Sequence, residues 1–389
     1  MTTPHAQVLD LVRGGTASSR ADVARLLSMS ASTASARVDA LVRRGLLVEH
    51  SDSTARAGRR PRVLRLRPGL GSVAAVDLRH AVAHLTVADL SGEVLGSDRL
   101  PVSLDEGPRV VLGAVADAVL ALASRSVTAP DEPSQERSGL QAVCVGVPGP
   151  VGPALDRVVA PARMPGWNGV DVAALGQELF GVPTLVENDV NLLAVGDHLQ
   201  RPGADHRVVV TVDTGIGCGV VVDGRLHRGA SGMAGDVSHT TVVGAPRVPC
   251  SCGRTACLDV IASGSALLSA LGEAGVPTAS MDELIRAVHD GHPLATGLVR
   301  EAGERIGDVL STVISFFNPA ELVLAGPVSS LPPFVAALRS RVYASCLPAT
   351  TASLAITRLA DGGEATRAGA IRLAADHAFA AGPLAARVR

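Results

Sequence analysis

The sequence predicts an α/β protein that begins with a winged helix-turn-helix segment. Two observations predict this arrangement. Residues 1–70 carry twelve arginines and five acidic residues, a formal charge of +7, whereas the rest of the chain carries −9. At residue 72 the pattern changes from short helices to apolar strands that alternate with helices. A basic segment on an acidic body is typical of a polyanion-binding module joined to a second domain, the alternative being an accident of sampling.

Size and hydropathy exclude other classes of protein. The chain has 389 residues, of which 47% are hydrophobic, so it can form two or three domains with large cores and is not disordered as a whole. Its longest apolar runs are strand-sized, far shorter than the roughly 20 residues of a membrane-spanning helix. The N-terminus shows no secretory signal. We therefore expect a cytoplasmic protein with no membrane partner.

The N-terminal helices are predicted from their caps. Thr3-Pro4 predicts the start of a helix that a glycine pair ends. Ser19 and Asp22 resemble a capping box that opens a second, short helix. Residues 32–44 then have apolar residues at helical spacing on one face. The polar outer face of this third helix consists of Ser32, Thr33, Ser35 and Arg37.

A helix-turn-helix followed by a basic hairpin predicts DNA binding. Short hydroxyls allow close approach to bases and phosphates, and an arginine can pair with guanine. Residues 46–48 and 63–67 predict two strands, and Arg59 and Arg60 lie in the turn between them. Such a wing can reach a minor groove or nearby phosphates. A three-helix protein-docking module is the alternative.

The body is predicted to be α/β. A long helix is predicted over residues 110–123, and strands over residues 73–76, 82–87, 141–147, 183–186 and 208–212. The last strand runs into the glycine-rich stretch 213–219, whose backbone N–H groups could face an anion. The alternative is a hairpin that needs small residues for packing.

Three of the six cysteines fall within eight residues and, with an upstream histidine, form a candidate metal site. Its members are His239, Cys250, Cys252 and Cys257. One imidazole and three thiolates match a structural Zn²⁺ site with no open coordination position. Disulfides and chance are the alternatives, but a Cys-x-Cys disulfide is strained and a cytosolic chain does not favour bridges.

An Asn-Asp pair, Asn188 and Asp189, follows the strand predicted at 183–186. Such a pair can hold a sugar's hydroxyl groups, and the aspartate can act as a general base. A helix N-cap made by either residue is the alternative. Glu187, just before this pair, and Asp236, just before His239, are further acidic candidates.

Six motifs in order resemble the ROK family (repressors, open reading frames and sugar kinases), and the resemblance covers essentially the whole chain. The motifs occupy residues 145–151, 187–191, 213–219, 228–239, 250–257 and 318–326. The winged helix ahead of them resembles the repressor branch, which includes xylose and N-acetylglucosamine repressors.

The resemblance implies an actin-like body of two lobes over residues 71–389, with a sugar in the cleft and structural zinc beside it. The first lobe would span about residues 71–190 with the C-terminal helix, and the second about 191–370. Carried over by position, the sugar contacts would be Asn188, Asp189, Asp236, His239 and Asp259. Asp189 would match the kinases' catalytic base, and His239 would also bind the metal.

Two departures from the family pattern argue against an enzyme. The kinases begin the body with aspartate, glycine and threonine on a hairpin that holds ATP phosphates, whereas this chain has Asp77-Leu78-Arg79-His80-Ala81. Arg79 would block the close backbone approach there. Asp213 stands where a glycine is usual and places a negative charge near any phosphate.

The resemblance therefore implies a repressor that binds an inverted-repeat operator as a homodimer or homotetramer and responds to a sugar or sugar phosphate. One alternative is a hexose kinase with a fused DNA-binding domain. Another is a ligand-independent regulator with a vestigial sugar cleft, because Asp236 and Asp259 replace glutamates of the usual pattern and Ser238 replaces a glycine.

Overall fold

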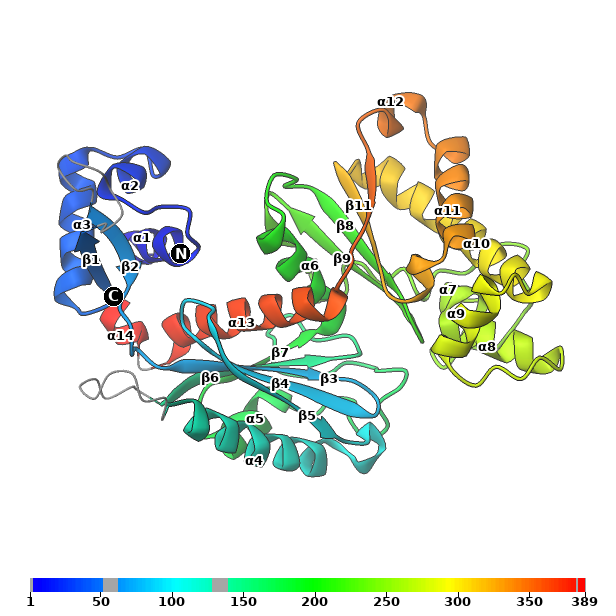
Figure 1. The fold of residues 1–389 in the computed structure, drawn as a ribbon, viewed down its shortest axis with the longest axis horizontal. Coiled ribbons are helices and arrows are strands. Elements are labelled where there is room, and N and C mark those ends of the chain that lie inside the picture. Colours follow the sequence, from blue (N-terminus) through cyan, green and yellow to red (C-terminus); the bar gives the residue numbers. More distant parts are fainter. Residues whose placement is uncertain (1–2, 52–61, 128–138, 383, 389) are drawn as a thin grey trace. The chain divides into compact units, whose positions relative to one another are not determined.

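The structure of the chain, a computed structural model, describes residues 3–51, 62–127, 139–382 and 384–388 (Figure 1). The chain divides into two compact units. The first unit combines Met1–Gly146, Asp171–Val186 and Ala370–Arg389, and the second combines Val147–Val170 and Glu187–Gly369. In the part of the chain that is described, no helix is both long and apolar enough to cross a bilayer.

Three capped helices open the first unit, as the sequence predicts. They are α1 (Pro4–Arg13), α2 (Arg20–Leu26) and α3 (Ala31–Arg43). The predicted cap at Ser19 is confirmed, because its hydroxyl accepts a hydrogen bond from the Asp22 N–H at 3.1 Å; the return bond to Asp22 comes from the N–H of Ser18, at 3.2 Å, and not from that of Ser19. The Asp22 carboxylate in turn accepts bonds from the Ser19 hydroxyl and from Arg25, which lower its pKa to about 2.

A two-stranded antiparallel sheet follows these helices. It pairs β1 (Leu47–Ser51) with β2 (Arg62–Leu66). Arg20 on α2 donates to Glu49 on β1 at 2.8 Å and contacts Asp39 on α3 at 2.6 Å, so one side chain ties both helices to the sheet. The turn between the strands, with Arg59 and Arg60, lies outside the described residues.

The first unit also holds a five-stranded sheet in the order β5-β4-β3-β6-β7. The pairs β3/β4 and β4/β5 are antiparallel, and β3/β6 is parallel. Helices α4 and α5 cover one face (Figure 1). The elements are β3 (Ser72–Leu78), β4 (Val82–Asp89), β5 (Val94–Pro101), η1 (Leu104–Glu106), α4 (Pro108–Val127), β6 (Leu140–Val147), α5 (Val172–Phe180) and β7 (Thr184–Asn188).

A second five-stranded sheet, in the order β10-β9-β8-β11-β12, repeats this topology in the second unit. Its first two pairs are antiparallel and its last two parallel. Successive residues of β8 (Arg207–Val212) face opposite sides of the sheet. Val208 and Val210 pack in the cluster around α10 (Pro293–Phe317) and α11 (Pro332–Ser345), whereas Val209 packs with residues of α6 (Asp189–Gln200). Because both faces of the sheet are buried, the sequences of its strands contain continuous runs of valine rather than alternating apolar and polar residues.

The second unit consists of this sheet and the helices that belong to the same unit. The strands are β8 (Arg207–Val212), β9 (Ile216–Val222), β10 (Arg225–Leu226), β11 (Glu321–Ala325) and β12 (Ala355–Arg358). The helices are α6 (Asp189–Gln200), α7 (Leu258–Ala262), α8 (Gly264–Glu273), α9 (Met281–His289), α10 (Pro293–Phe317), η2 (Val328–Ser330), α11 (Pro332–Ser345) and α12 (Pro348–Thr351).

Two helices end the chain. Helix α13 (Gly362–Ala381) begins in the second unit and continues into the first. Helix α14 (Ala385–Val388) binds the end of α3, because Arg387 donates to the carbonyl of Arg44 at 2.8 Å and Arg44 donates to the carbonyl of Val388 at 3.1 Å. The N-terminal helices and the C-terminus are thus joined within one unit.

Candidate functional site

The four predicted metal-ligating side chains lie together in the second unit. The ligand atoms of His239, Cys250, Cys252 and Cys257 all fall within 4.8 Å of one another. The Cys250 sulfur lies 3.5 Å from Nδ1 of His239, and the sulfurs of Cys252 and Cys257 are 3.6 Å apart. Around a tetrahedral zinc ion these separations would be about 3.6 and about 3.8 Å. The donor set and its spacing therefore fit a metal ion.

Backbone pairing brings these ligands together. The Cys250 N–H donates to the Arg254 carbonyl at 2.8 Å, and the turn between them passes through Gly253 at φ +84°. Cys257 then lies beside Thr241 in an antiparallel bridge, which places it near His239. Cys257 is fully buried, and its burial, followed by the neighbouring thiols, raises its pKa to about 12. A hydrogen bond from the backbone of Arg254 lowers the pKa of the exposed Cys252.

Asn188 and Asp189 lie at the start of α6. The N-cap alternative is confirmed for Asn188, whose Oδ1 accepts bonds from the N–H groups of Val190 at 3.0 Å and Asn191 at 3.1 Å. Its Nδ2 donates to the Gly149 carbonyl at 3.1 Å, which fixes the amide orientation. Asp189 is the first residue of the helix and is half-buried.

Asp236 and Asp259, the two aspartates that replace glutamates of the family pattern, already have hydrogen-bond partners within the second unit. Asp259 accepts a bond from the Ile216 N–H at 3.1 Å and another from Arg163 Nη2 at 2.9 Å. Asp236 is exposed and accepts a bond from the Ser238 hydroxyl at 2.7 Å. The Asp259 N–H donates to the Ser238 carbonyl at 2.9 Å, so the segments that carry Asp236, His239 and Asp259 lie side by side.

Strand β9 contacts both Asp259 and the helix that begins with Asp189. The N–H of its first residue, Ile216, donates to Asp259, and Gly217 and Gly219, further along the strand, face α6. A Cβ at Gly217 would overlap the Val190 side chain, and one at Gly219 would lie 2.8 Å from the Ala194 Cβ. The packing alternative is therefore correct for these two glycines, and the expectation that they face an anion is wrong: they belong to a strand pressed against a helix.

Residues 213–215 form the turn before β9, and three of the N–H groups in and beside this turn are already engaged. The N–H of Asp213 donates to the Gly215 carbonyl at 2.9 Å, and the N–H of Thr214 donates to the carboxylate of Asp213 at 2.7 Å. The N–H of Ile216, the first residue of β9, donates to Asp259. A phosphate could accept bonds from these three groups only after the present bonds are broken.

In the first unit, the turn after β3 carries the predicted departure at Arg79. Its Nε donates to Asp77 at 3.1 Å, and its N–H donates to the Val82 carbonyl at 2.8 Å. The carboxylate of Asp77 is nearly buried and bound to a cation of its own chain.

The polar outer face predicted for the third helix is found at the start of α3. Ser32 and Thr33 are exposed, whereas Ser35 and Arg37 are half-buried. Both exposed hydroxyls lie within hydrogen-bond distance of the N-cap hydroxyl of Ser30, at 2.9 and 2.8 Å. They are therefore ordered at the helix N-terminus, where the backbone dipole favours an anion.

Sequence reasoning missed two arginines of the site. Arg163 binds Asp259, and Arg228 donates to the fully buried Glu187 at 2.7 Å. Glu187 also accepts a bond from the Asn191 amide at 2.8 Å and so anchors α6. The sequence made Glu187 an acidic candidate, because it follows an apolar strand directly, but did not indicate its partners. Neither arginine lies in a pattern that indicates its partner.

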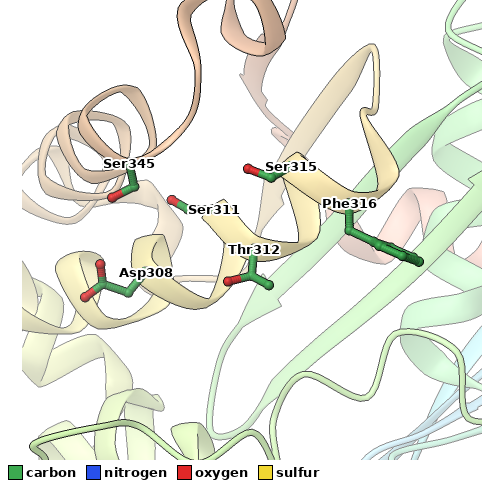
Figure 2. Close-up of a pocket in the computed structure, with 6 residues that line it drawn as sticks. All are labelled: Asp308, Ser311, Thr312, Ser315, Phe316 and Ser345. Carbon is green, nitrogen blue, oxygen red and sulfur yellow. The ribbon is translucent and has the colours of Figure 1, made fainter.

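A shallow hollow of about 480 Å³ lies between α10 and α11 (Figure 2). Ser345 of α11 faces Ser311 of α10 across it, and Phe316, further along α10, also lines it. None of the candidate metal or sugar residues lines this hollow.

Comparisons with known proteins agree with these features. The model of the ROK family matches residues 73–377. The xylose repressor of Caldicellulosiruptor bescii is 27% identical over 328 residues, which cover 80% of this chain and 79% of the repressor.

One similar solved structure covers nearly the whole of this chain, and another covers about four-fifths of it. A ROK family transcriptional regulator, a homologue of the Escherichia coli MLC protein, covers 99% of this chain and 98% of its own at a TM-score of 0.79 and 20% identity. The ROK hexokinase of Thermus thermophilus covers 78% of this chain and 97% of its own at a TM-score of 0.63 and 29% identity. The fold of the regulator thus accounts for the N-terminal helices as well as for the body.

Proposed function

Because the chain belongs to the ROK family, we propose that it is a sugar-responsive, DNA-binding repressor of genes for carbohydrate uptake or catabolism. The single observation that carries the choice of repressor over kinase is the turn at residues 213–216, where the N–H groups of Asp213, Thr214 and Ile216 are taken by Gly215, Asp213 and Asp259. A kinase needs such groups free for ATP phosphates.

Both turns that would meet phosphates in a kinase depart from the family pattern, at Arg79 and at Asp213. Arg79 is paired with Asp77, and the carboxylate of Asp213 accepts a bond from the N–H of Thr214 in its own turn. A bulky side chain at the first position blocks the close approach of a phosphate to the backbone, and a negative charge at the second repels phosphate. The body is therefore proposed to bind a sugar without phosphorylating it.

DNA binding is proposed for the N-terminal segment as a winged helix-turn-helix. The charge of +7 over residues 1–70 and the ordered hydroxyls of Ser32 and Thr33 at the start of α3 support it. A homodimer would present two copies of α3 to an inverted repeat, with half-sites about one or two helical turns apart.

The sugar site is proposed to comprise Asn188, Asp189, Asp236, His239 and Asp259, with Zn²⁺ held by His239, Cys250, Cys252 and Cys257. Zinc with four protein ligands supplies a structural cross-link and no open position for chemistry. Its role would be to hold His239 and the segment of Asp259 in place beside the sugar.

The proposal is tested by a gel shift on the DNA upstream of the protein's own gene, at fixed salt. D-xylose, D-glucose and N-acetylglucosamine, free and phosphorylated, are added in turn. A complex whose affinity changes with one of them supports the repressor. A complex that none of them alters favours a vestigial cleft, and ATP turnover with any of the sugars would establish the kinase instead.

The wing is expected to bind DNA phosphates. Replacing Arg59 and Arg60 by alanine should weaken DNA binding on all sequences and lower the slope of log K against log salt by about 0.9 for each phosphate that the variant no longer neutralises. Arg109→Ala, which removes an exposed arginine on α4, is the matched control and should leave the slope unchanged. An unchanged slope in the double variant would show that the wing does not bind the DNA backbone.

Asp259 is expected to bind the sugar in competition with Arg163. Asp259→Ala should weaken sugar binding at least about 10-fold, since a hydrogen bond to a charged group contributes about 1.5–3 kcal/mol. Arg163→Gln should leave binding equal or tighter, because it frees an oxygen of Asp259 for a hydroxyl. Calorimetry with the sugar found in the gel shift measures both, with Asp156→Asn on an exposed pair as control. Equal weakening in both variants would show that the sugar needs the intact pair.

A further inference from the structure

Two helices connect the proposed sugar site to the proposed DNA-binding segment. Helix α6 begins with Asp189, and α13 contacts α6 through its first turns and α1 through its last turns. We propose that α13 carries the sugar signal to the DNA-binding helices, with Arg13 as the positioning residue that receives it. This inference rests on the proposed function.

The contact between α6 and α13 in the second unit is one of backbone on backbone. A Cβ at Gly196 would overlap the carbonyl of Ala365, and a Cβ at Gly369 would overlap the carbonyl of Leu192. Ala365 is fully buried in a cluster with Leu193 and other residues of α6. At both glycines the nearest atoms are backbone atoms, which cannot rotate away as a side chain can, so the first turns of α13 must follow any movement of α6.

The contact between α13 and α1 in the first unit is an ion pair between a buried arginine and a half-exposed carboxylate. Only 3% of the Arg13 side chain is exposed, and its guanidinium binds Asp376. Arg372 holds the same carboxylate at 3.1 Å, and the Arg13 guanidinium lies 5.5 Å from the ring centre of Phe379. Burial, followed by the charge of Arg372, lowers the pKa of Arg13 to about 10, so it remains charged at neutral pH.

The Arg13 guanidinium resists separation from Asp376, because at its buried position water cannot take the place of the carboxylate. Helix α1 must therefore keep its place on the last turns of α13. Those turns belong to one continuous helix of 20 residues, about 30 Å long. A ligand that shifts α6 at one end biases the position of α1 at the other, as a change in the population of two arrangements.

The variant Asp376→Asn tests this coupling. It weakens the pair but leaves Arg13 a second partner, Asp10 at 3.5 Å, so the helices are expected to remain folded. The measurement is the ratio of DNA dissociation constants with and without sugar, for the upstream DNA and the same panel of free and phosphorylated xylose, glucose and N-acetylglucosamine. We expect each affinity alone to stay within about 3-fold of wild type, and the ratio, typically about 5–150 for coupled sites, to fall to nearly 1.

Two further variants make the result specific. Phe379→Leu keeps the ion pair, removes the ring beside Arg13 and should lower the ratio in part; it also serves if Asp376→Asn does not fold. Glu178→Gln, on an exposed pair in the same unit, should leave the ratio unchanged. Wild-type ratios in both α13 variants would overturn this inference alone. A wild-type protein whose DNA affinity no sugar changes would overturn the proposed function, and the coupling with it.

Discussion

Replacing Cys257 by serine is expected to remove the metal from the chain, to lower the free energy of unfolding by at least about 3 kcal/mol, and to abolish the response to sugar. Cys257 is fully buried, and its sulfur lies 3.6 Å from the sulfur of Cys252 in the four-residue cluster. A serine hydroxyl is not ionised at neutral pH, so the variant offers three ligands where a structural zinc site has four.

The large effect follows from what the cluster holds in place. Between His239 and Cys257 the chain has little regular structure, and its order depends on short bridges such as the one between Thr241 and Cys257. The same segment positions Asp259, whose N–H donates to the Ser238 carbonyl. Without a metal, too few buried contacts remain to keep this loop ordered beside the proposed sugar site.

Metal content, thermal unfolding and the sugar-dependent gel shift together measure the outcome. Cys346→Ser is the matched control: it replaces another buried thiol, and a hydroxyl there can still donate to the Ser311 carbonyl that the sulfur approaches at 3.5 Å. It should keep its metal and its response. If wild-type protein purified without chelator contains no zinc, or keeps its melting temperature and sugar response after chelation, the metal site is wrong.

Signals confined to a few neighbouring residues predicted much of this molecule. The caps at Thr3 and Ser19 fixed the starts of α1 and α2, because a cap acts within one turn. Valine runs located β8 and its neighbours, and the spacing of cysteines located the metal cluster, since its three cysteines are close in sequence. Each of these predictions depends on geometry within a short stretch of chain.

Features that depend on distant partners could not be predicted in the same way. Arg163 lies 96 positions from Asp259, and nothing around it indicates that it binds a carboxylate. Gly217 and Gly219 suggested a phosphate loop because their spacing is the same whether the chain turns or continues as a strand. Only the side chains of Val190 and Ala194 on α6 reveal that these glycines are needed for close packing.

The charged residues around α6 give the second large prediction. Asp197 on α6 is fully buried, and its carboxylate accepts bonds from Arg207 Nη1 at 2.5 Å and from Arg201 Nη2 at 2.6 Å. Glu321 lies 3.2 Å from Arg207 and accepts a bond from Thr357 at 2.6 Å. This network fastens α6, and hence Asp189 at its start, to strands β8 and β11. The sequence alone gives no indication that Arg207, at the start of a strand, has these partners.

Asp197→Leu is expected to lower the free energy of unfolding by about 3–5 kcal/mol, because Arg207, only 1% exposed, keeps its charge and loses its main partner. Replacing Arg207 by methionine as well should restore most of the stability, since two apolar side chains can fill the site of a buried ion pair. Urea unfolding of the wild type, both single variants and the double variant measures the coupling, and Glu178→Gln on an exposed pair should cost less than about 1 kcal/mol. If the double variant is no more stable than Asp197→Leu, the unpaired arginine is not the source of the destabilisation. The cost would then come from the packing of α6 itself, and the network would serve to orient that helix rather than to stabilise it.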